Sequence, residues 1–189
     1  QERDKLYQEL VSARENLEVK TEELTRLTRL DPLTSLLNRR ALTADLNKLI
    51  TLIKRKYVPL CFVLIDIDFF KPINDNFGHE YGDEVLIKLA AVLKGVVRES
   101  DLVARWGGEE FIVILPKTAE SEAKELALSL LETVEAHTFR LRKNRTVKLT
   151  MSCGLSQLLQ GDDIEDLLKR TDKALYSAKK SGRNQLVTI

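Results

Sequence analysis

Residues 102–115 read Leu-Val-Ala-Arg-Trp-Gly-Gly-Glu-Glu-Phe-Ile-Val-Ile-Leu, and the rest of the predicted fold is arranged around them. Two apolar runs of strand-forming residues flank a short polar break with paired glycines, which predicts a β-hairpin. The break carries two adjacent carboxylates, Glu109 and Glu110, at the end of two strands that are predicted to be buried. Gly107 and Gly108 leave the backbone open to close approach by another molecule. The alternative interpretation is an ordinary solvated turn.

A second predicted strand also ends in acidic residues. Residues 61–68 read Cys-Phe-Val-Leu-Ile-Asp-Ile-Asp, a continuous apolar run that predicts a central strand buried on both faces. Alternation along the strand places Asp66 and Asp68 on one side and Ile67 on the other. A buried carboxylate is costly unless a cation or metal pairs with it. If this strand lies beside the hairpin, Asp66 and Glu109 converge on a hard divalent cation, whose natural ligands are oxygens, including those of bound phosphates.

Composition limits the classes of protein to which the chain can belong. With 189 residues, 43% hydrophobic and 31% charged, we expect one core of ordinary size plus an appendage. Thirty basic and 29 acidic residues leave a formal charge of +1, which gives no general electrostatic attraction to a nucleic acid polymer or an anionic membrane. Cys61 and Cys153 lie in apolar runs without a C-x-x-C spacing, which predicts buried thiols in a reducing compartment. The sequence contains no signal peptide and no eighteen-residue apolar span.

The first 30 residues form a separate predicted unit, and the main domain is predicted over residues 31–189. Leu10, Leu17 and Leu24 stand seven residues apart, which predicts a two-stranded coiled coil that is marginal alone. The alternative is a single amphipathic helix docked on its own domain. The first residue is Gln1 rather than Met, so we expect a fragment of a longer protein.

The order of predicted elements indicates an α+β fold. Helices are expected over residues 39–56, 83–97, 119–136 and 163–180, with strands over 61–68, on both sides of the hairpin break, and over 147–155 and 185–189. This order predicts an α/β sandwich, with a mixed sheet of about five strands flanked by helices and a ferredoxin-like βαββαβ core.

The segment between the predicted central strand and the next helix contains Asn74 and Asp83. An amide and a carboxylate together offer the acceptors and donors that recognise the edge of a purine. Both residue types are also common turn formers and helix caps, which is the alternative interpretation. His79 and His137 have no metal-ligand partner at a useful spacing, and we interpret both as structural or exposed.

Taken together, these motifs resemble the GGDEF domain of the diguanylate cyclase family. The signature occurs in its Glu variant at Gly107-Gly-Glu-Glu-Phe111, after Arg105-Trp106. Three further landmarks of the family lie within residues 31–40, 66–83 and 172–184, so the resemblance covers residues 31–189. It implies a fold similar to nucleotide cyclases and polymerase palms, and the condensation of two GTP into cyclic di-GMP with release of two pyrophosphates.

The resemblance also implies roles for individual residues. Asp66, Glu109 and the carbonyl of Ile67 would hold two Mg²⁺ or Mn²⁺ ions, and Glu110 would support the metals or help to deprotonate the 3′-hydroxyl. Phosphoryl transfer depends mainly on such positioning and metal charge. The implied substrate contacts are the guanine readers Asn74 and Asp83, Phe69, Phe70, the phosphate contacts Lys71, Lys179 and Arg183, and the backbone of Gly107 and Gly108.

Arg98 and Asp101 match the R-x-x-D pattern at which the family's product inhibits its own synthesis. The resemblance implies that stacked cyclic di-GMP binds there, and arginine suits bidentate contacts to phosphate or guanine. From the residues alone, a solvated ion pair at a helix end is the alternative.

The sequence predicts an active cyclase that works as a homodimer. Each chain supplies one metal site and one set of guanine readers, so two chains would face each other about a two-fold axis, joined by the N-terminal coiled coil. The alternatives are a silent domain that binds GTP or cyclic di-GMP as a receptor, and a module that only transmits a sensor's signal by dimerisation. We expect a cytoplasmic location, also as the cytoplasmic part of a larger sensor, without direct membrane contact and without a nucleic acid polymer as partner.

Overall fold

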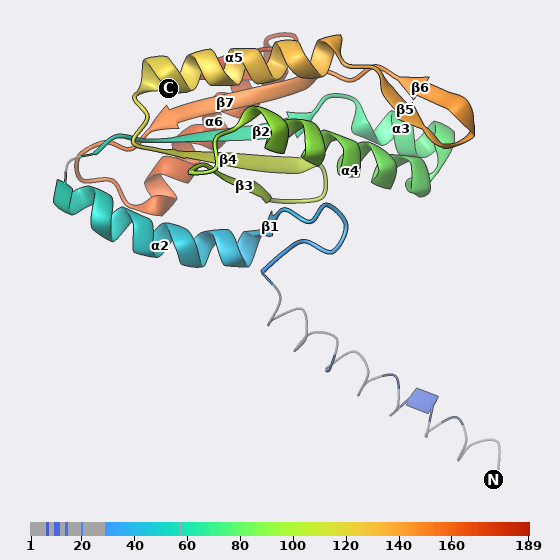
Figure 1. The fold of residues 1–189 in the computed structure, drawn as a ribbon, viewed down its shortest axis with the longest axis horizontal. Helices are drawn as coiled ribbons and strands as arrows, with labels where there is room; N and C mark the ends of the chain where they lie inside the picture. Colours follow the sequence, from blue (N-terminus) through green and yellow to red (C-terminus); the bar gives the residue numbers. More distant parts are fainter. Residues whose placement is uncertain (1–6, 8–9, 12–13, 15–19, 21–28, 57) are drawn as a thin grey trace.

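The computed structural model describes residues 7, 10, 11, 14, 20, 29–56 and 58–189. At its centre lies a six-stranded mixed sheet with the strand order β1-β3-β4-β2-β7-β8 (Figure 1). A separate two-stranded sheet is formed by β5 (Phe139–Leu141) and β6 (Arg145–Val147). The strands of the central sheet are β1 (Leu37–Asn38), β2 (Leu60–Ile67), β3 (Leu102–Arg105), β4 (Glu110–Pro116), β7 (Met151–Gln157) and β8 (Leu186–Thr188).

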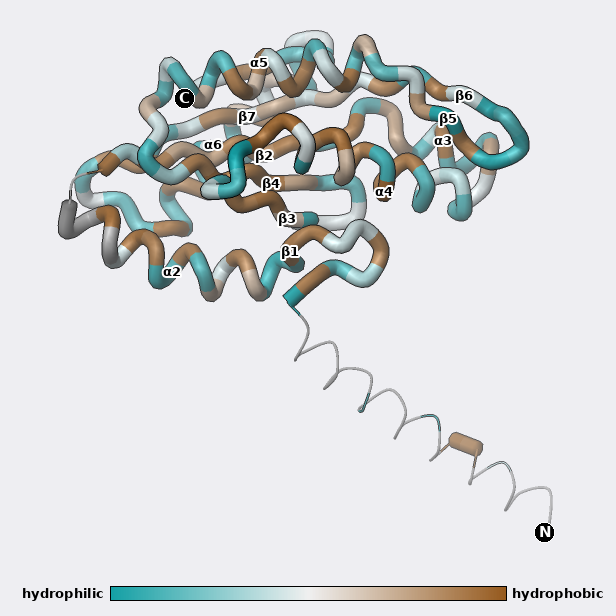
Figure 2. Tube along the Cα trace, in the orientation of Figure 1, coloured by the Kyte–Doolittle hydropathy of each residue, from teal (hydrophilic) through white to brown (hydrophobic). Residues whose placement is uncertain are grey.

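Helices cover both faces of the central sheet. Helices α2 (Arg39–Lys56) and α6 (Ile164–Lys180) pack against one face, while α4 (His79–Val96) and α5 (Glu120–Ala136) pack against the other. The short helix α3 (Phe70–Phe77) follows β2 directly. Figure 2 shows hydrophobic residues gathered along the strands and alternating with hydrophilic residues along α2 and α5. Among the described residues, no helix is long and apolar enough to cross a membrane.

Strand β2 is buried along its whole length, as its apolar run predicted. Its residues alternate between the two cores: Cys61 and Val63 face the core under α4 and α5, while Phe62 and Leu64 face the core under α2 and α6. Cys61 and Cys153 are free, buried thiols, in agreement with the sequence. Burial raises the pKa of the Cys61 thiol to about 12.

The sheet register brings the predicted acidic strand ends together. Strand β2 pairs antiparallel with β4 on one side and with β7 on the other. In this register Asp66 lies opposite Glu110 of β4 and opposite Ser152 of β7. The hairpin of β3 and β4 is therefore the immediate neighbour of the strand that carries Asp66.

Several boundaries differ from the sequence predictions. The sheet has six strands rather than about five, because Leu37–Asn38 pairs in parallel with β3 inside what the sequence suggested was only a polar turn. The strand expected over 147–155 is divided into β6 and β7, and β5 was not predicted. Helix α4 begins at His79, four residues before the predicted start. The heptad residues Leu17 and Leu24 lie outside the described residues.

Helix α6 lies unusually close to strand β7. A Cβ atom at Gly154 would stand 2.3 Å from the carbonyl oxygen of Thr171 and 2.3 Å from the backbone nitrogen of Leu175. Only glycine leaves room for this approach of helix to strand. The same helix carries Lys179 to the end of β2.

Candidate active site

Three acidic residues lie near one another where β2 ends beside the hairpin. The backbone N–H of Ile67 donates to the carbonyl oxygen of Glu109 at 3.4 Å, and Glu110 faces Asp66 across the strand pair. Burial raises the pKa of all three acidic side chains, and the charge of Asp66 raises the pKa of both glutamates further. The structure thus brings Asp66, Glu109 and Glu110 together, as the sequence predicted.

Lys179 is the nearest cation to this group. Its Nζ lies 2.8 Å from Oδ2 of Asp66, whose side chain is only 7% exposed. Burial outweighs the lowering effect of Lys179 and Arg183, so the pKa of Asp66 remains raised. The three carboxylates carry more negative charge than this one close ammonium neutralises, which is the condition under which a divalent cation binds.

The oxygen donors at this point suit a hard metal ion but do not enclose one. Within the described part of the chain, no three side chains of the ligating types are close enough to hold an ion by themselves. Mg²⁺ commonly binds to one or two carboxylates and completes its shell with water and substrate phosphates. The residues therefore fit a metal that arrives together with a phosphorylated ligand.

Asp68 has a different role from Asp66. Its carboxylate accepts hydrogen bonds from Oγ1 of Thr150 at 2.8 Å, Oγ of Ser152 at 2.7 Å and the backbone N–H of Asn184 at 3.0 Å. Three donors satisfy most of its hydrogen-bonding capacity, so Asp68 ties β2 to the start of β7 and to the loop after α6.

The tip of the hairpin is held by Arg105, to which the sequence patterns had assigned no role. Its guanidinium donates to the carbonyl oxygen of Gly108 at 2.7 and 3.2 Å and to both carboxylate oxygens of Asp31 at 3.3 Å. Asp31 also accepts from the backbone N–H and the hydroxyl of Thr34, both at 2.8 Å. Burial raises the pKa of Asp31, but the bonds from Thr34 and Arg105 outweigh it and lower that pKa overall. The hairpin tip is thereby fixed to the turn that precedes β1.

The glycines and Trp106 shape the surroundings of Glu110. The backbone N–H groups of Trp106 and Gly107 both donate to the carbonyl oxygen of Glu110, at 2.8 and 3.2 Å. A Cβ atom at Gly107 would stand 2.6 Å from Oε2 of Glu110, so glycine leaves space for that carboxylate. The guanidinium of Arg39 stacks on the Trp106 ring at 4.3 Å and lowers the pKa of Glu110, while Asp172 raises it. Sequence reasoning missed Arg39 and Asp172 because their proximity arises from tertiary packing.

Asn74 and Asp83 lie on neighbouring helices. Asn74 is on α3 and half-buried, whereas Asp83 is exposed near the start of α4. A Cβ atom at Gly82 would stand only 1.9 Å from Oδ1 of Asn74, so the Asn74 amide rests against the backbone of α4 next to Asp83. This arrangement brings the Asn74 amide to the residue that precedes Asp83, the other residue that the sequence proposed as a guanine reader, and it assigns Gly82 a role that the sequence had not.

The remaining predicted substrate contacts surround the start of α3. Phe69 has a left-handed backbone conformation with φ 56°, Phe70 is buried, and Lys71 is exposed. The guanidinium of Arg183 stacks on the exposed Phe69 ring at 4.8 Å and also lowers the pKa of Asp66. Lys179 and Arg183, the two predicted phosphate contacts on α6 and in the loop after it, are thus both near Asp66.

Arg98 and Asp101 lie apart from the carboxylates, at the end of α4. The backbone N–H of Arg98 donates to Oδ2 of Asp101 at 2.9 Å, and the Arg98 side chain remains exposed. Both residues line a cavity of about 490 Å³, together with Lys94 and residues of the segment 30–37. The Asp101 carboxylate therefore caps the backbone N–H of Arg98 beside an open cavity.

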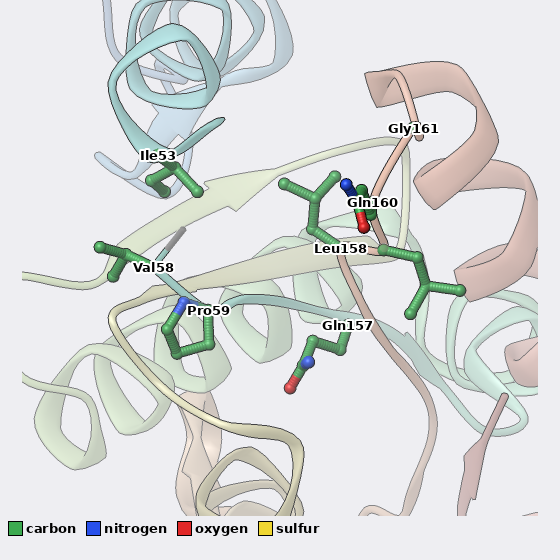
Figure 3. Close-up of a pocket in the computed structure, with 8 residues that line it drawn as sticks. Ile53, Val58, Pro59, Gln157, Leu158, Gln160 and Gly161 are labelled. Atoms are coloured by element: carbon green, nitrogen blue, oxygen red, sulfur yellow. The ribbon is translucent and has the colours of Figure 1, made fainter. Parts of the chain in front are cut away.

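A further cavity of about 410 Å³ lies at the opposite end of β2 (Figure 3). Its lining combines apolar residues such as Ile53, Pro59 and Leu158 with the amide side chains of Gln157 and Gln160. Along β2, Pro59 of this cavity lies seven residues from Asp66, roughly 23 Å in an extended strand. It contributes no group to the acidic site.

Comparisons with known proteins agree with this geometry. A family model described as "Diguanylate cyclase, GGDEF domain" matches residues 28–185. The response regulator PleD of Caulobacter vibrioides is 45% identical over 159 residues, which cover 83% of this chain and 35% of that relative. The chain thus spans about a third of the length of this relative.

Solved structures show the same fold. The GGDEF domain of DgcB from Caulobacter crescentus, in complex with c-di-GMP, has a TM-score of 0.82 and 31% identity, covering 85% of this chain and 92% of that one. The active GGEEF domain of a diguanylate cyclase from Vibrio cholerae has a TM-score of 0.75 and 42% identity, covering 81% and 97%. The chain belongs to the GGDEF domain family, the family of the diguanylate cyclases.

Proposed function

We propose that this chain is a diguanylate cyclase, which condenses two GTP molecules into cyclic di-GMP and releases two pyrophosphates. The observation that carries the proposal is the meeting of Asp66, Glu109 and Glu110 beside Lys179, with the pKa of each carboxyl group raised. Such perturbed groups are common at sites that bind metals and move protons. Its similarity to named diguanylate cyclases supports the same activity.

Asp66, Glu109 and the carbonyl oxygen of Ile67 would hold two divalent ions, Mg²⁺ or Mn²⁺, with support from Glu110. When bound, these ions polarise the α-phosphate and lower the pKa of the attacking 3′-hydroxyl. The excess of negative charge, and the lack of a complete set of ligating side chains among the described residues, both suit ions that share their shell with the phosphates of GTP.

The protein's own side chains position the reactants. Lys179 and Arg183 hold the β- and γ-phosphates, so that the leaving pyrophosphate is neutralised as it departs. Glu110 lies beside the residues that would hold the ions, where its carboxylate would support them or help to accept the proton of the 3′-hydroxyl. Asn74 and Asp83 read the guanine edge, whose donors face the Asp83 carboxylate. Adenine presents the opposite pattern and leaves these groups unpaired.

The test is incubation of the purified protein with GTP and Mg²⁺, followed by separation of the nucleotides. We expect cyclic di-GMP from the wild type and from Glu125→Gln, a control on the exposed surface of α5. Glu109→Gln should abolish turnover because it removes a negative ligand. Residual activity within about tenfold of the wild type, roughly 1.4 kcal/mol of barrier, contradicts the ligand role. Binding of GTP without any product would identify a receptor domain instead.

Catalysis requires two chains in this proposal, because one chain supplies one acidic site and one pair of guanine readers. Two sites facing each other about a two-fold axis allow each 3′-hydroxyl to attack the other α-phosphate. The N-terminal segment would raise the local concentration of the partner, at a cytoplasmic location where GTP is available. Deletion of residues 1–28 should make the activity per molecule fall as the protein is diluted. Activity per molecule that does not depend on concentration would contradict a dimeric enzyme.

The cavity beside Arg98 and Asp101 would bind the product and inhibit synthesis. Its lining includes two basic residues, Lys94 and Arg98, which suit a ligand with two phosphates, and two acidic residues, Glu99 and Asp101. Its position at the far end of α4 keeps it separate from the guanine readers at the beginning of that helix.

A further inference from the structure

The β5–β6 hairpin takes no part in the proposed chemistry, although it forms many polar contacts. It lies outside the central sheet and beside α3 and α4 (Figure 1). Residues 142–144 connect its two strands in a single short turn. Two arginines at this turn, Arg142 and Arg145, reach the region where α3 ends and α4 begins.

Arg142 is bound to the first turns of α4. Its backbone N–H donates to Oε2 of Glu84 at 2.8 Å, its Nε donates to Oε1 of Glu84 at 3.1 Å, and its Nη1 pairs with Glu80. Hydrogen bonds from Arg142 lower the pKa of Glu84, and the bond to Glu84 in turn raises the pKa of Arg142. Because one bond comes from the backbone, the connection fixes the turn itself as well as the arginine side chain.

Arg145 contacts both helices at once. Its guanidinium lies 5.2 Å from the ring centroid of Phe77, the last residue of α3, and 5.7 Å from that of Tyr81, in the first turn of α4. The two rings are 6.0 Å apart. A cation shared by two aromatic rings favours one relative position of the helices that carry them.

This relative position determines the geometry of the guanine readers. Asn74 lies three residues before Phe77 on α3, and Asp83 lies directly before Glu84 on α4. The two helices are joined only by Gly78, with φ 91°, a conformation that glycine adopts easily. A joint of one glycine leaves the angle between the helices to be fixed by side-chain contacts, and Arg142 and Arg145 supply such contacts from outside.

We propose that the β5–β6 hairpin holds α3 and α4 at the spacing that guanine recognition requires, and that Arg142 and Arg145 are positioning residues for Asn74 and Asp83. The inference deepens the proposed function and rests on its assignment of the guanine readers. It concerns the fit of the base and leaves the acidic site unchanged, because neither arginine contacts Asp66, Glu109 or Glu110 among the interactions of the described residues.

The test compares the double variant Arg142→Ala/Arg145→Ala with the wild type and with Arg140→Ala. Arg140 is an exposed arginine on the same hairpin, and in the described part of the chain it forms no ion pair with α3 or α4. We expect the KM for GTP to rise about tenfold in the double variant while kcat stays within about threefold, and we expect Arg140→Ala to match the wild type.

A second readout separates positioning from general stability. Inosine triphosphate lacks the 2-amino group of guanine, so it removes one of the donors that face Asp83. The wild type should prefer GTP to this analogue, and the double variant should lose most of that preference. Arg142→Lys keeps a positive charge near Glu80 and Glu84 but lacks the forked geometry of the guanidinium. Its preference for GTP should therefore lie between those of the wild type and the double variant. A loss of thermal stability alone would lower both activities without changing their ratio.

The outcomes are distinguishable. The inference is wrong if the folded double variant keeps both the KM for GTP and the GTP preference within about twofold of the wild-type values. If the double variant does not fold, the same criterion applies to each single variant. If the wild type binds GTP but makes no product, the proposed function fails, and the ratio of dissociation constants for GTP and inosine triphosphate then tests the role of the hairpin. If the wild type binds neither nucleotide, both proposals are wrong.

Discussion

Replacement of Gly82 by alanine tests the contact between Asn74 and α4 most directly. The added Cβ would stand 1.9 Å from Oδ1 of Asn74 and 3.1 Å from Cζ of Phe70. Cβ atoms essentially never come within 3.0 Å of another heavy atom, so the Asn74 amide has to move by about 1 Å or more. The neighbour that moves is the end of a polar side chain, so the fold should survive the substitution.

The expected magnitude follows from the usual strength of hydrogen bonds. If Asn74 reads guanine as proposed, its displacement removes one or two hydrogen bonds to the base, about 1–3 kcal/mol together. This corresponds to a fall of about 5- to 150-fold in kcat/KM for GTP. Helix propensity acts in the opposite direction, because alanine is favoured over glycine inside a helix by about 1 kcal/mol. Gly82→Ala should therefore impair the enzyme without making it markedly less stable.

Gly95→Ala is the matched control on the same helix. A Cβ atom at Gly95 would have nothing within 4 Å, so only the helix propensity changes there. We expect its steady-state kinetics to equal those of the wild type and its Tm to rise by about 2–4 °C. Steady-state kinetics with GTP and thermal melting of all three proteins provide the measurement. If Gly82→Ala stays within threefold of Gly95→Ala in kcat/KM, Asn74 does not read the base from the position described.

Three further changes test other parts of the site. Arg98→Ala should leave initial rates unchanged but require at least tenfold more cyclic di-GMP for half-inhibition. Unchanged inhibition would show that the Arg98–Asp101 turn has only a structural role. Burial, and then Asp66, raise the pKa of Glu109, so the folded chain binds its proton more tightly than the unfolded chain and the ionised side chain opposes folding at neutral pH. Glu109→Gln should therefore raise the Tm of the metal-free protein at about pH 7. This gain in Tm should disappear below about pH 4.3, the usual glutamate pKa. A lower Tm at neutral pH would show that the charge of Glu109 is not destabilising. ATP should yield less than about a hundredth of the product that GTP yields, and comparable turnover of the two would contradict base recognition by Asn74 and Asp83.

The parts of the fold that were predictable from sequence are those with long, regular signals. The apolar run that ends at Asp66 and the paired runs around the glycines predicted β2, β3 and β4 and the pairing of β3 with β4, because short apolar runs bounded by turn residues are typical of buried strands. From the sequence, the adjacency of β2 and β4 was only a condition, and the sheet register supplies it. Strand β1 has only two residues, and β5 and β6 have three each with arginines among them. Segments this short show no periodicity, so they form only because neighbouring elements pair with them.

The site shows the same limit at the level of single residues. Alternation placed Asp66 and Asp68 on the same side of the strand and gave no reason to distinguish them. The donors that satisfy Asp68 come from Thr150, Ser152 and Asn184, which lie 82, 84 and 116 residues away in the chain. Pairing between such distant positions depends on tertiary packing, which a single sequence does not reveal.

The close approach of α6 to β7 at Gly154 affects which mutations the enzyme can tolerate. Any side chain at this position meets the helix backbone itself, which has nowhere to move except away from the sheet. The helix carries Lys179 one turn beyond Leu175, so even alanine would draw the Lys179 ammonium, the proposed phosphate contact, away from Asp66. In a mutational survey scored by activity, position 154 should therefore be as intolerant as a catalytic residue, although it holds no functional group and touches no substrate.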